Sequence, residues 1–97
     1  MADINEATAE ILLENEVFRV TKWTLAPGET IPMHVHEHEY VVIPMLPTPM
    51  EVTPAGEDTF VFEMVPGTSY SRPKGSEHQI HNPSRTDTVQ FIEVEAL

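Results

Sequence analysis

Short apolar runs alternate with turns rich in proline and glycine along the whole chain, without an internal repeat, a low-complexity segment or a linker. Proline and glycine favour turns because proline restricts φ and glycine tolerates positive φ. Short strands separated by such turns are typical of an all-β sandwich or barrel. The pattern predicts nine β-strands, over residues 11–13, 17–25, 30–36, 40–45, 50–53, 59–64, 69–71, 78–82 and 88–94. A short helix over residues 5–9 is an alternative for the start of the chain.

Two of the predicted strands are largely apolar at successive positions, which indicates burial of both their faces. They are Phe60-Val61-Phe62 and Val89-Gln90-Phe91-Ile92. We expect such strands to lie between the barrel interior and an opposing sheet or subunit. The nine prolines of the chain limit how many strands can lie in the middle of a sheet. Some edges are therefore expected to be short or exposed.

Length, composition and charge narrow the class of protein. The 97 residues, 40% of them apolar, suit one globular domain spanning residues 1–97. No apolar run approaches the roughly 18 residues needed to cross a bilayer, and the acidic N-terminus lacks the features of a secretion signal, so we expect a soluble cytoplasmic protein. The absence of cysteine excludes disulfides, thiolate metal sites and cysteine nucleophiles. A formal charge of −11 argues against nucleic acid and anionic membranes as partners.

Three of the five histidines lie in the segment from Gly28 to Tyr40, which reads GETIPMHVHEHEY. On an extended strand, His34 and His36 point to the same face about 6.6 Å apart along the strand, so both imidazoles can reach one metal ion. His38 would lie roughly 13 Å from His34, which is too far for the same ion. A third ligand would come from the two remaining histidines, of which only one can share the inward face. These are His78 and His81.

The tyrosine that ends this segment suggests how the chain turns. A three-residue hairpin loop over residues 37–39 would place His36 and Tyr40 opposite each other, with β-carbons about 5 Å apart. Tyr40 would then face the site. His38 would lie at the tip of the loop, either exposed or at the rim of a pocket.

Two motifs in the sequence resemble those of the cupin family. Gly28, His34 and His36 stand as G-x5-H-x-H, the opening of the first cupin motif. The second motif, G-x5-P-x-G-x2-H-x3-N, is matched at every position, by Gly67, Pro73, Gly75, His78 and Asn82. The segment HVHEHEYVVIP is also similar to that of a bacterial subgroup whose members are named for β-alanine degradation. The chain therefore resembles a small single-domain cupin.

The resemblance implies both a fold and a metal site. The fold is the cupin double-stranded β-helix, a small jelly-roll barrel of six to eight strands in two sheets. His34, His36 and His78 would bind one divalent metal ion at its mouth. In the family, a glutamate ligand normally follows the second histidine after three or four intervening residues, and here these positions hold Tyr40 and Val41. Three neutral imidazoles would leave the ion its full double charge, and Fe, Ni, Zn, Mn and Cu are all candidates.

Tyr40 is the candidate catalytic residue. A phenol with a pKa near 10 is a poor anionic ligand, so we expect Tyr40 to lie near the metal without binding it. It would donate a hydrogen bond to water or substrate, or act as general acid or base. The alternative is a tyrosine that only forms the pocket wall. The other expected lining residues favour a small organic ligand; they are Phe60, Phe62, Met45 and Phe91, with Gln90 or Arg72 as polar points.

These features predict a metalloenzyme acting on a small polar metabolite by oxygenase, lyase or isomerase chemistry. The alternative is a non-catalytic cupin that binds a small metabolite or metal. The resemblance also implies a homodimer, with the strands over residues 11–13 and 17–25 as candidate contacts. Among the remaining residues, Trp23, Phe62 and the methionines are interpreted as core, Asn82 as structural, and Gly28, Gly67 and Gly75 as turn glycines.

Overall fold

The structure, a computed structural model, describes residues 6–97, and over this range the chain is all-β. Its strands are β1 (Thr8–Glu14), β2 (Phe18–Leu25), β3 (Thr30–Val35), β4 (Tyr40–Pro44), β5 (Met50–Pro54), β6 (Phe60–Phe62), β7 (Tyr70–Arg72), β8 (Glu77–His81) and β9 (Val89–Ala96). Every predicted strand is present, with bounds that differ by a few residues. The helical alternative is wrong over residues 6–9, because Glu6 bridges to Thr30 and β1 begins at Thr8; Asn5 lies outside the described residues.

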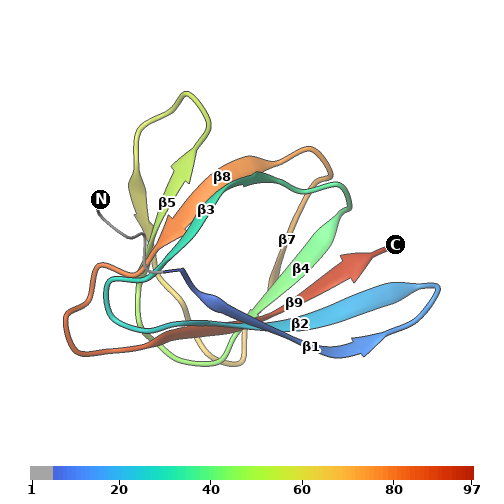
Figure 1. Cartoon of the computed structure of the whole chain (residues 1–97), viewed down its shortest axis with the longest axis horizontal. Helices are drawn as coiled ribbons and strands as arrows, with labels where there is room; N and C mark the ends of the chain where they lie inside the picture. The colour runs from blue at the N-terminus through green and yellow to red at the C-terminus, as the bar shows by residue number, and fades with distance from the viewer. Residues whose placement is uncertain (1–5) are drawn as a thin grey trace.

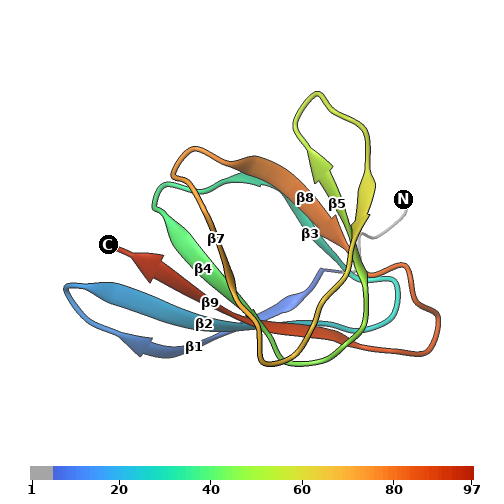
Figure 2. The same cartoon turned by 180° about the vertical axis from the view of Figure 1, so that it is seen from behind.

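The strands form two antiparallel sheets that face each other, as Figures 1 and 2 show. The larger sheet has the order β1-β2-β9-β4-β7, and the smaller has the order β3-β8-β5-β6. The expected two-sheet barrel is thus confirmed, with nine strands in place of six to eight because β1 and the short β6 and β7 extend the edges. Residues 6–97 contain no helix, and hence none of the length and apolarity needed to span a membrane.

The hydrophobic core lies between the two sheets. The alternation along β9 turns Val89, Phe91 and Glu93 inward, and similar alternation along the other strands completes the core. Its other buried apolar residues are Leu25, Ile31, Tyr40, Val42, Met50, Val52, Met64 and Ile80. The prediction of strands covered on both faces is right for the central β9, whose outward residues are half-buried. It is wrong within this chain for β6, an edge strand on which Phe60 and Val61 are exposed.

A β-bulge in β3 sets the direction of the first histidine. The pairing with β8 shifts by one residue between Ile31 and His34, so Pro32 and Met33 lie opposite a single residue of β8. Strict alternation from the buried Ile31 would turn Met33 inward and His34 outward. The extra residue returns His34 to the side of Ile31, whereas Met33 is 43% exposed. Proline is tolerated here because a bulged position does not need its ladder hydrogen bond.

The predicted three-residue hairpin over residues 37–39 is wrong. β3 pairs with β8 in one sheet, whereas β4 pairs with β7 and β9 in the other, so the segment between them crosses from sheet to sheet. It is held against the turn before β8, because His36 N–H donates to the Ser76 carbonyl and Gly75 N–H donates to the His36 carbonyl, both at 2.8 Å. Figures 1 and 2 show these two connections side by side at one end of the barrel. The turn needs glycine at position 75, where φ is 92°.

Candidate metal centre

Three histidine side chains converge at this end of the barrel. His34 lies on β3, His36 directly follows β3, and His78 lies on β8 opposite His34. The Nε2 atoms of His34 and His36 are 2.9 Å apart, and those of His36 and His78 are 3.0 Å apart. The ring centroids lie between 4.6 and 4.9 Å apart in all three pairs. The three rings therefore form a compact cluster with their Nε2 atoms together, and we call it the histidine cluster.

Hydrogen bonds alone do not account for this arrangement. The Nδ1 atom of His34 lies 2.7 Å from the Pro32 carbonyl, to which only a protonated Nδ1 can donate, so the Nε2 atom of the neutral ring carries a lone pair. If His36 Nε2 carried a proton, it could donate that proton to His34 Nε2. The equally short contact between His36 Nε2 and His78 Nε2 would then have no hydrogen bond of its own. A cation bound by all three lone pairs satisfies both contacts at once. The bulge carbonyl of Pro32 thus fixes the tautomer that a metal requires.

The distances also match a metal centre. Nitrogen ligands about 2.1 Å from one ion stand about 3.0 Å apart when their bonds are at right angles, and about 3.4 Å apart in a tetrahedron. The observed 2.9 and 3.0 Å correspond to the first case. Three histidine ligands leave further coordination positions for water or an organic ligand. The histidine cluster is therefore compatible with a metal ion.

The protonation of the cluster points in the same direction. Burial, together with the charge of the neighbouring His34, lowers the pKa of His36 to about 3 and that of His78 to about 4. Both rings are neutral at pH 7 as a result. Neutral imidazole is the form that binds a metal.

The other two histidines do not belong to the cluster. His38 is half-buried and lines a second hollow that borders the cluster at His34 and His36 and also includes Arg19 and Glu95. His81 points away from the barrel interior, and its Nδ1 lies 2.9 Å from the Thr30 hydroxyl. Strand geometry alone left His78 and His81 as alternatives, the cupin resemblance implied His78, and His78 shares the inward face of β8 with Ile80.

Tyr40 stacks directly on His36. Their ring centroids are 3.8 Å apart and their planes are inclined by 20°. Tyr40 is only 2% exposed, and its hydroxyl has no hydrogen-bond partner among the described residues. Burial, with the negative charge of Glu93, raises the pKa of Tyr40 to about 12. The side chain is therefore a neutral phenol at the position of the family's glutamate, and it contacts one imidazole of the cluster.

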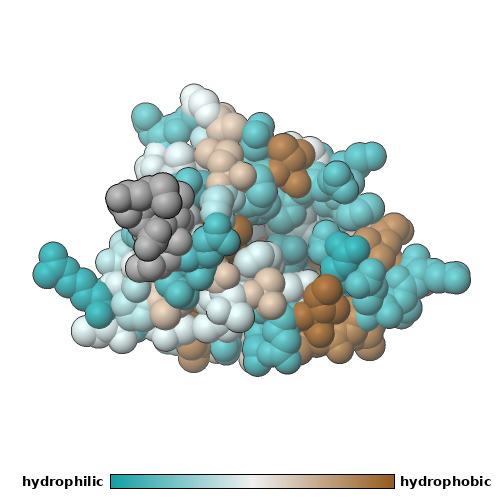
Figure 3. All heavy atoms as spheres, in the orientation of Figure 1, coloured by the Kyte–Doolittle hydropathy of each residue, from teal (hydrophilic) through white to brown (hydrophobic). Residues whose placement is uncertain are grey.

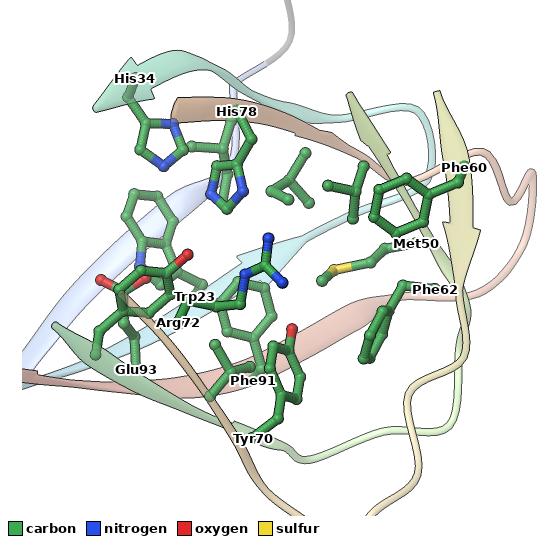
Figure 4. Close-up of a pocket in the computed structure, with 15 residues that line it drawn as sticks. Trp23, His34, Met50, Phe60, Phe62, Tyr70, Arg72, His78, Phe91 and Glu93 are labelled. Carbon is green, nitrogen blue, oxygen red and sulfur yellow. The ribbon is translucent and has the colours of Figure 1, made fainter. Parts of the chain in front are cut away.

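A pocket of ≈ 640 Å³, counting its open mouth, extends from the histidine cluster between the two sheets. Figure 4 shows His34, His78 and Glu93 towards one end and Met50, Phe60 and Phe62 at the other. Of the lining residues expected from the sequence, Tyr40, Phe60, Phe62, Phe91 and Arg72 are present. Met45 and Gln90 were wrongly included: Met45 is 47% exposed, and Gln90 points outward to the Thr24 hydroxyl.

The pocket also contains a buried carboxyl group that sequence reasoning missed. Glu93 is 8% exposed and lines the pocket together with Trp23 (Figure 4). Burial, and secondarily the negative charge of Glu95, raises the pKa of Glu93 to about 7. The available signal was its place in the alternation, two residues after the inward Phe91. Trp23, interpreted as core, packs against the core but also lines this pocket.

Asn82 has the structural role expected of it. It is fully buried, and its Nδ2 donates to the carbonyl oxygens of Leu25 and Asp87, while its Oδ1 accepts from Ser84 N–H. These bonds tie the end of β8 to β2 and to the turn before β9. Asn82 therefore supports the site without lining the pocket.

Comparison with known proteins agrees with the fold and the motifs. A family model described as a cupin domain matches residues 21–95. The chain is 35% identical over 91 residues, covering 93% of each sequence, to the beta-alanine degradation protein BauB of Pseudomonas aeruginosa. A cupin domain from Bordetella pertussis Tohama I has a TM-score of 0.89 with 35% identity, covering 100% of this chain and 99% of that one.

A more distant structure shares the fold alone. It is an RmlC-like cupin from Methanocaldococcus jannaschii with a double-stranded β-helix fold, with a TM-score of 0.78 and 21% identity, covering 99% of this chain and 84% of that one. The expected double-stranded β-helix is thus confirmed. Because the family model covers most of the sequence and the relatives cover nearly all of it, the chain belongs to the cupin family.

Proposed function

We propose that His34, His36 and His78 bind one divalent metal ion per chain, and that the protein is a metalloenzyme acting on a small organic metabolite. The observation that carries the proposal is the histidine cluster, in which the Nε2 atom of His36 lies 2.9 Å from that of His34 and 3.0 Å from that of His78, with all three ligand atoms within 4.8 Å of one another at the end of a pocket. A metal held by three histidines supplies Lewis-acid activation of water or a carbonyl group, or oxygen chemistry if it is Fe(II).

The chain's own residues would position the ligand. Tyr40 presents a protonated phenol beside His36, and Glu93 presents a carboxyl group whose pKa near 7 suits proton transfer. The name of the Pseudomonas relative connects that protein with β-alanine degradation, which is in keeping with a small metabolite as substrate.

A non-catalytic binding protein is the second candidate. Phenylalanines and aliphatic residues form most of the pocket wall, which suits a small organic ligand whether or not it is converted. Oxygen uptake or turnover by the metal-loaded protein in a screen of small acids and sugars would favour the enzyme. Thermal stabilisation by such a compound without turnover would favour the binding protein.

The metal content of variants tests the centre directly. Protein purified without a polyhistidine tag is analysed by mass spectrometry of its bound metals. Alanine at position 34, 36 or 78 is expected to remove most of the metal in each case, because two imidazoles bind an ion far more weakly than three. His38→Ala and His81→Ala are matched controls and should keep it. Wild-type protein that takes up no stoichiometric metal, or equal loss from His38→Ala, would contradict the proposed centre.

A further inference from the structure

The pocket contains one cation whose charge is not paired. Arg72 lies on the edge strand β7, and its guanidinium group points into the pocket on the same side as His78 and the Tyr70 hydroxyl (Figure 4). In the described part of the chain, Arg19 and Lys22 form ion pairs and Arg72 forms none. A guanidinium carries five N–H donors and no acceptor. A ligand that reaches Arg72 would therefore have to accept hydrogen bonds.

A neighbouring polar group has the same requirement. Tyr40 lines this pocket, and its buried hydroxyl lies near Arg72 without a well-formed hydrogen bond to any of residues 6–97. The Tyr70 hydroxyl lies in the same pocket, and a phenol O–H is a hydrogen-bond donor. Two phenols beside a guanidinium in a largely apolar pocket favour an anionic acceptor.

The shape of the guanidinium group, and its single copy in the pocket, indicate which kind of anion would bind. A planar guanidinium pairs with a carboxylate through two parallel hydrogen bonds. There is one such group in the pocket, and Glu93 lies in the same pocket as a competing acid. One planar guanidinium matches one planar carboxylate, whereas a phosphate ester would bring a second negative charge towards Glu93. The charge of a metal at the histidine cluster would come in addition to that of Arg72.

The residues at the other end of the pocket indicate the polarity of the rest of the ligand. Figure 4 shows Met50, Phe60 and Phe62 across the pocket from the histidines, with Arg72 between the two ends. Phe60 is 43% exposed. An apolar tail placed there would remove this surface from water, which favours binding in proportion to the area covered.

The geometry points to a small monocarboxylate with an apolar tail as the ligand of this site, held by Arg72 at the carboxylate and by Phe60 and Phe62 at the tail. This inference rests on the proposed function, because the ligand's head lies at the end of the pocket that the metal would occupy. Arg72 acts as a binding residue that fixes the ligand's direction. The apolar tail separates this ligand class from amino acids and sugars, which would leave the phenylalanines uncovered.

Isothermal titration calorimetry with acetate, butanoate and hexanoate tests the inference, on metal-free and on zinc-loaded protein. Affinity should rise about fourfold for each added methylene group, because each buries apolar surface. Hexanamide and hexyl phosphate keep the tail and change the head, and both should bind more weakly than hexanoate. Arg72→Gln should weaken hexanoate binding about 10- to 100-fold and leave hexanamide unchanged, because only the charged hydrogen bonds are lost.

Two further variants complete the design. Arg85→Gln removes the same charge from a turn that does not line the pocket, and it should bind hexanoate as the wild type does. Arg72→Lys keeps the charge without the paired donors and should give an intermediate affinity. Failure of every carboxylate to bind at millimolar concentration, or equal hexanoate affinity in Arg72→Gln and wild type, would overturn the inference. If Arg72-dependent binding occurs in a protein that takes up no metal, the inference stands and the metal centre fails; metal uptake without such binding would support the centre and overturn the inference.

Discussion

At the scale of single residues, burial sets the protonation of the groups around the histidine cluster. Tyr40 and Glu93 both lie between the sheets, where the charged form of either group loses its hydration. The phenol is therefore harder to ionise than a free tyrosine, and the carboxyl group holds its proton up to about pH 7. The pocket thus presents two weak acids next to imidazoles that are themselves neutral.

Replacement of Tyr40 by phenylalanine tests whether Tyr40 binds the metal or only lines the pocket. Phenylalanine keeps the stacking on His36 and removes a buried hydroxyl without a partner, so thermal stability should be unchanged or slightly higher. Metal affinity measured by competition with a chelator should stay within a few-fold of wild type, while ligand affinity or turnover falls. Tyr40→Glu should bind metal more tightly, because it restores the family's fourth ligand.

Two results would contradict this view of Tyr40. One is release of the metal by Tyr40→Phe. The other is a charge-transfer band in the iron(III) protein that Tyr40→Phe lacks, since such a band requires a phenolate bound to iron.

The pH dependence of stability tests the environment of Glu93. The pKa of Glu93 rises from an ordinary value of 4.5 to about 7 in the folded chain. Between pH 4.5 and about pH 7, Glu93 is therefore protonated in the folded state and ionised in the unfolded state. Glu93 therefore lowers the free energy of unfolding progressively as pH rises from about 4.5 to about 7. In metal-free protein, Glu93→Gln should raise the melting temperature over wild type by a margin that grows across this range and is largest near pH 8.

The comparison of variants isolates this effect. The lowered pKa values of His36 and His78 act in the opposite direction, because they destabilise the metal-free protein as pH falls below 6.5, but wild type and Glu93→Gln share them. Glu39→Gln, at an exposed position, is the matched control and should show a constant margin near zero. A margin for Glu93→Gln that did not change with pH would show that the carboxyl group is not buried as described.

At the scale of elements, strand β1 is an edge strand that the rest of the chain leaves uncovered over its whole length. All its residues are exposed, among them Ile11, Leu12 and Leu13, and β2 begins with the exposed Phe18. In Figure 3 apolar residues gather over the end of the β1–β2 hairpin, at the lower right in the orientation of Figure 1. An apolar edge strand of this kind invites pairing with another chain. We propose that a second copy of the chain covers it.

Light scattering of Ile11→Glu tests the homodimer. Wild-type protein at micromolar concentration should give twice the chain mass, and the variant should dissociate at least about tenfold more readily, because a charge would be buried in the interface. Val61→Glu is the control: Val61 on β6 is 57% exposed and Ile11 is 58% exposed. Should the wild type be a clean monomer, the proposal fails; should Val61→Glu alone dissociate it, the interface lies on the other sheet.

At the scale of the whole molecule, a metal at the histidine cluster would join the two sheets. His34 and His78 belong to the smaller sheet, and His36 lies on the segment that leads to β4 in the larger one. Binding to the folded state alone adds about 2.7 kcal/mol at a free metal concentration of 100 times Kd. For a domain of this size that corresponds to a rise in Tm of roughly 10 to 20 °C. Scanning calorimetry with zinc or nickel should show this rise for wild type and little of it for His78→Ala; equal shifts in both would place the metal elsewhere.

Local patterns were sufficient to predict the strands, the turns and the membership of the histidine cluster. Alternation and turn residues act over a few neighbouring positions, so they can be recognised in sequence. The spacing of the two cupin motifs identified the family and, with it, the choice of His78 over His81. Glu93 could have been noticed by the same alternation but was overlooked among the acidic residues of a strongly acidic chain.

Tertiary structure decided what depends on the partner of each strand. Loop length alone suggested a hairpin between β3 and β4, yet each strand is paired in a different sheet, and the contact of Tyr40 with His36 is a stacking of rings across the connection. The bulge at Pro32 likewise exists only relative to β8, and it returns His34 to the inward face. Strand pairing joins residues far apart in the chain, so its register, and the burial that sets the pKa of Tyr40 and Glu93, arise only when the two sheets come together.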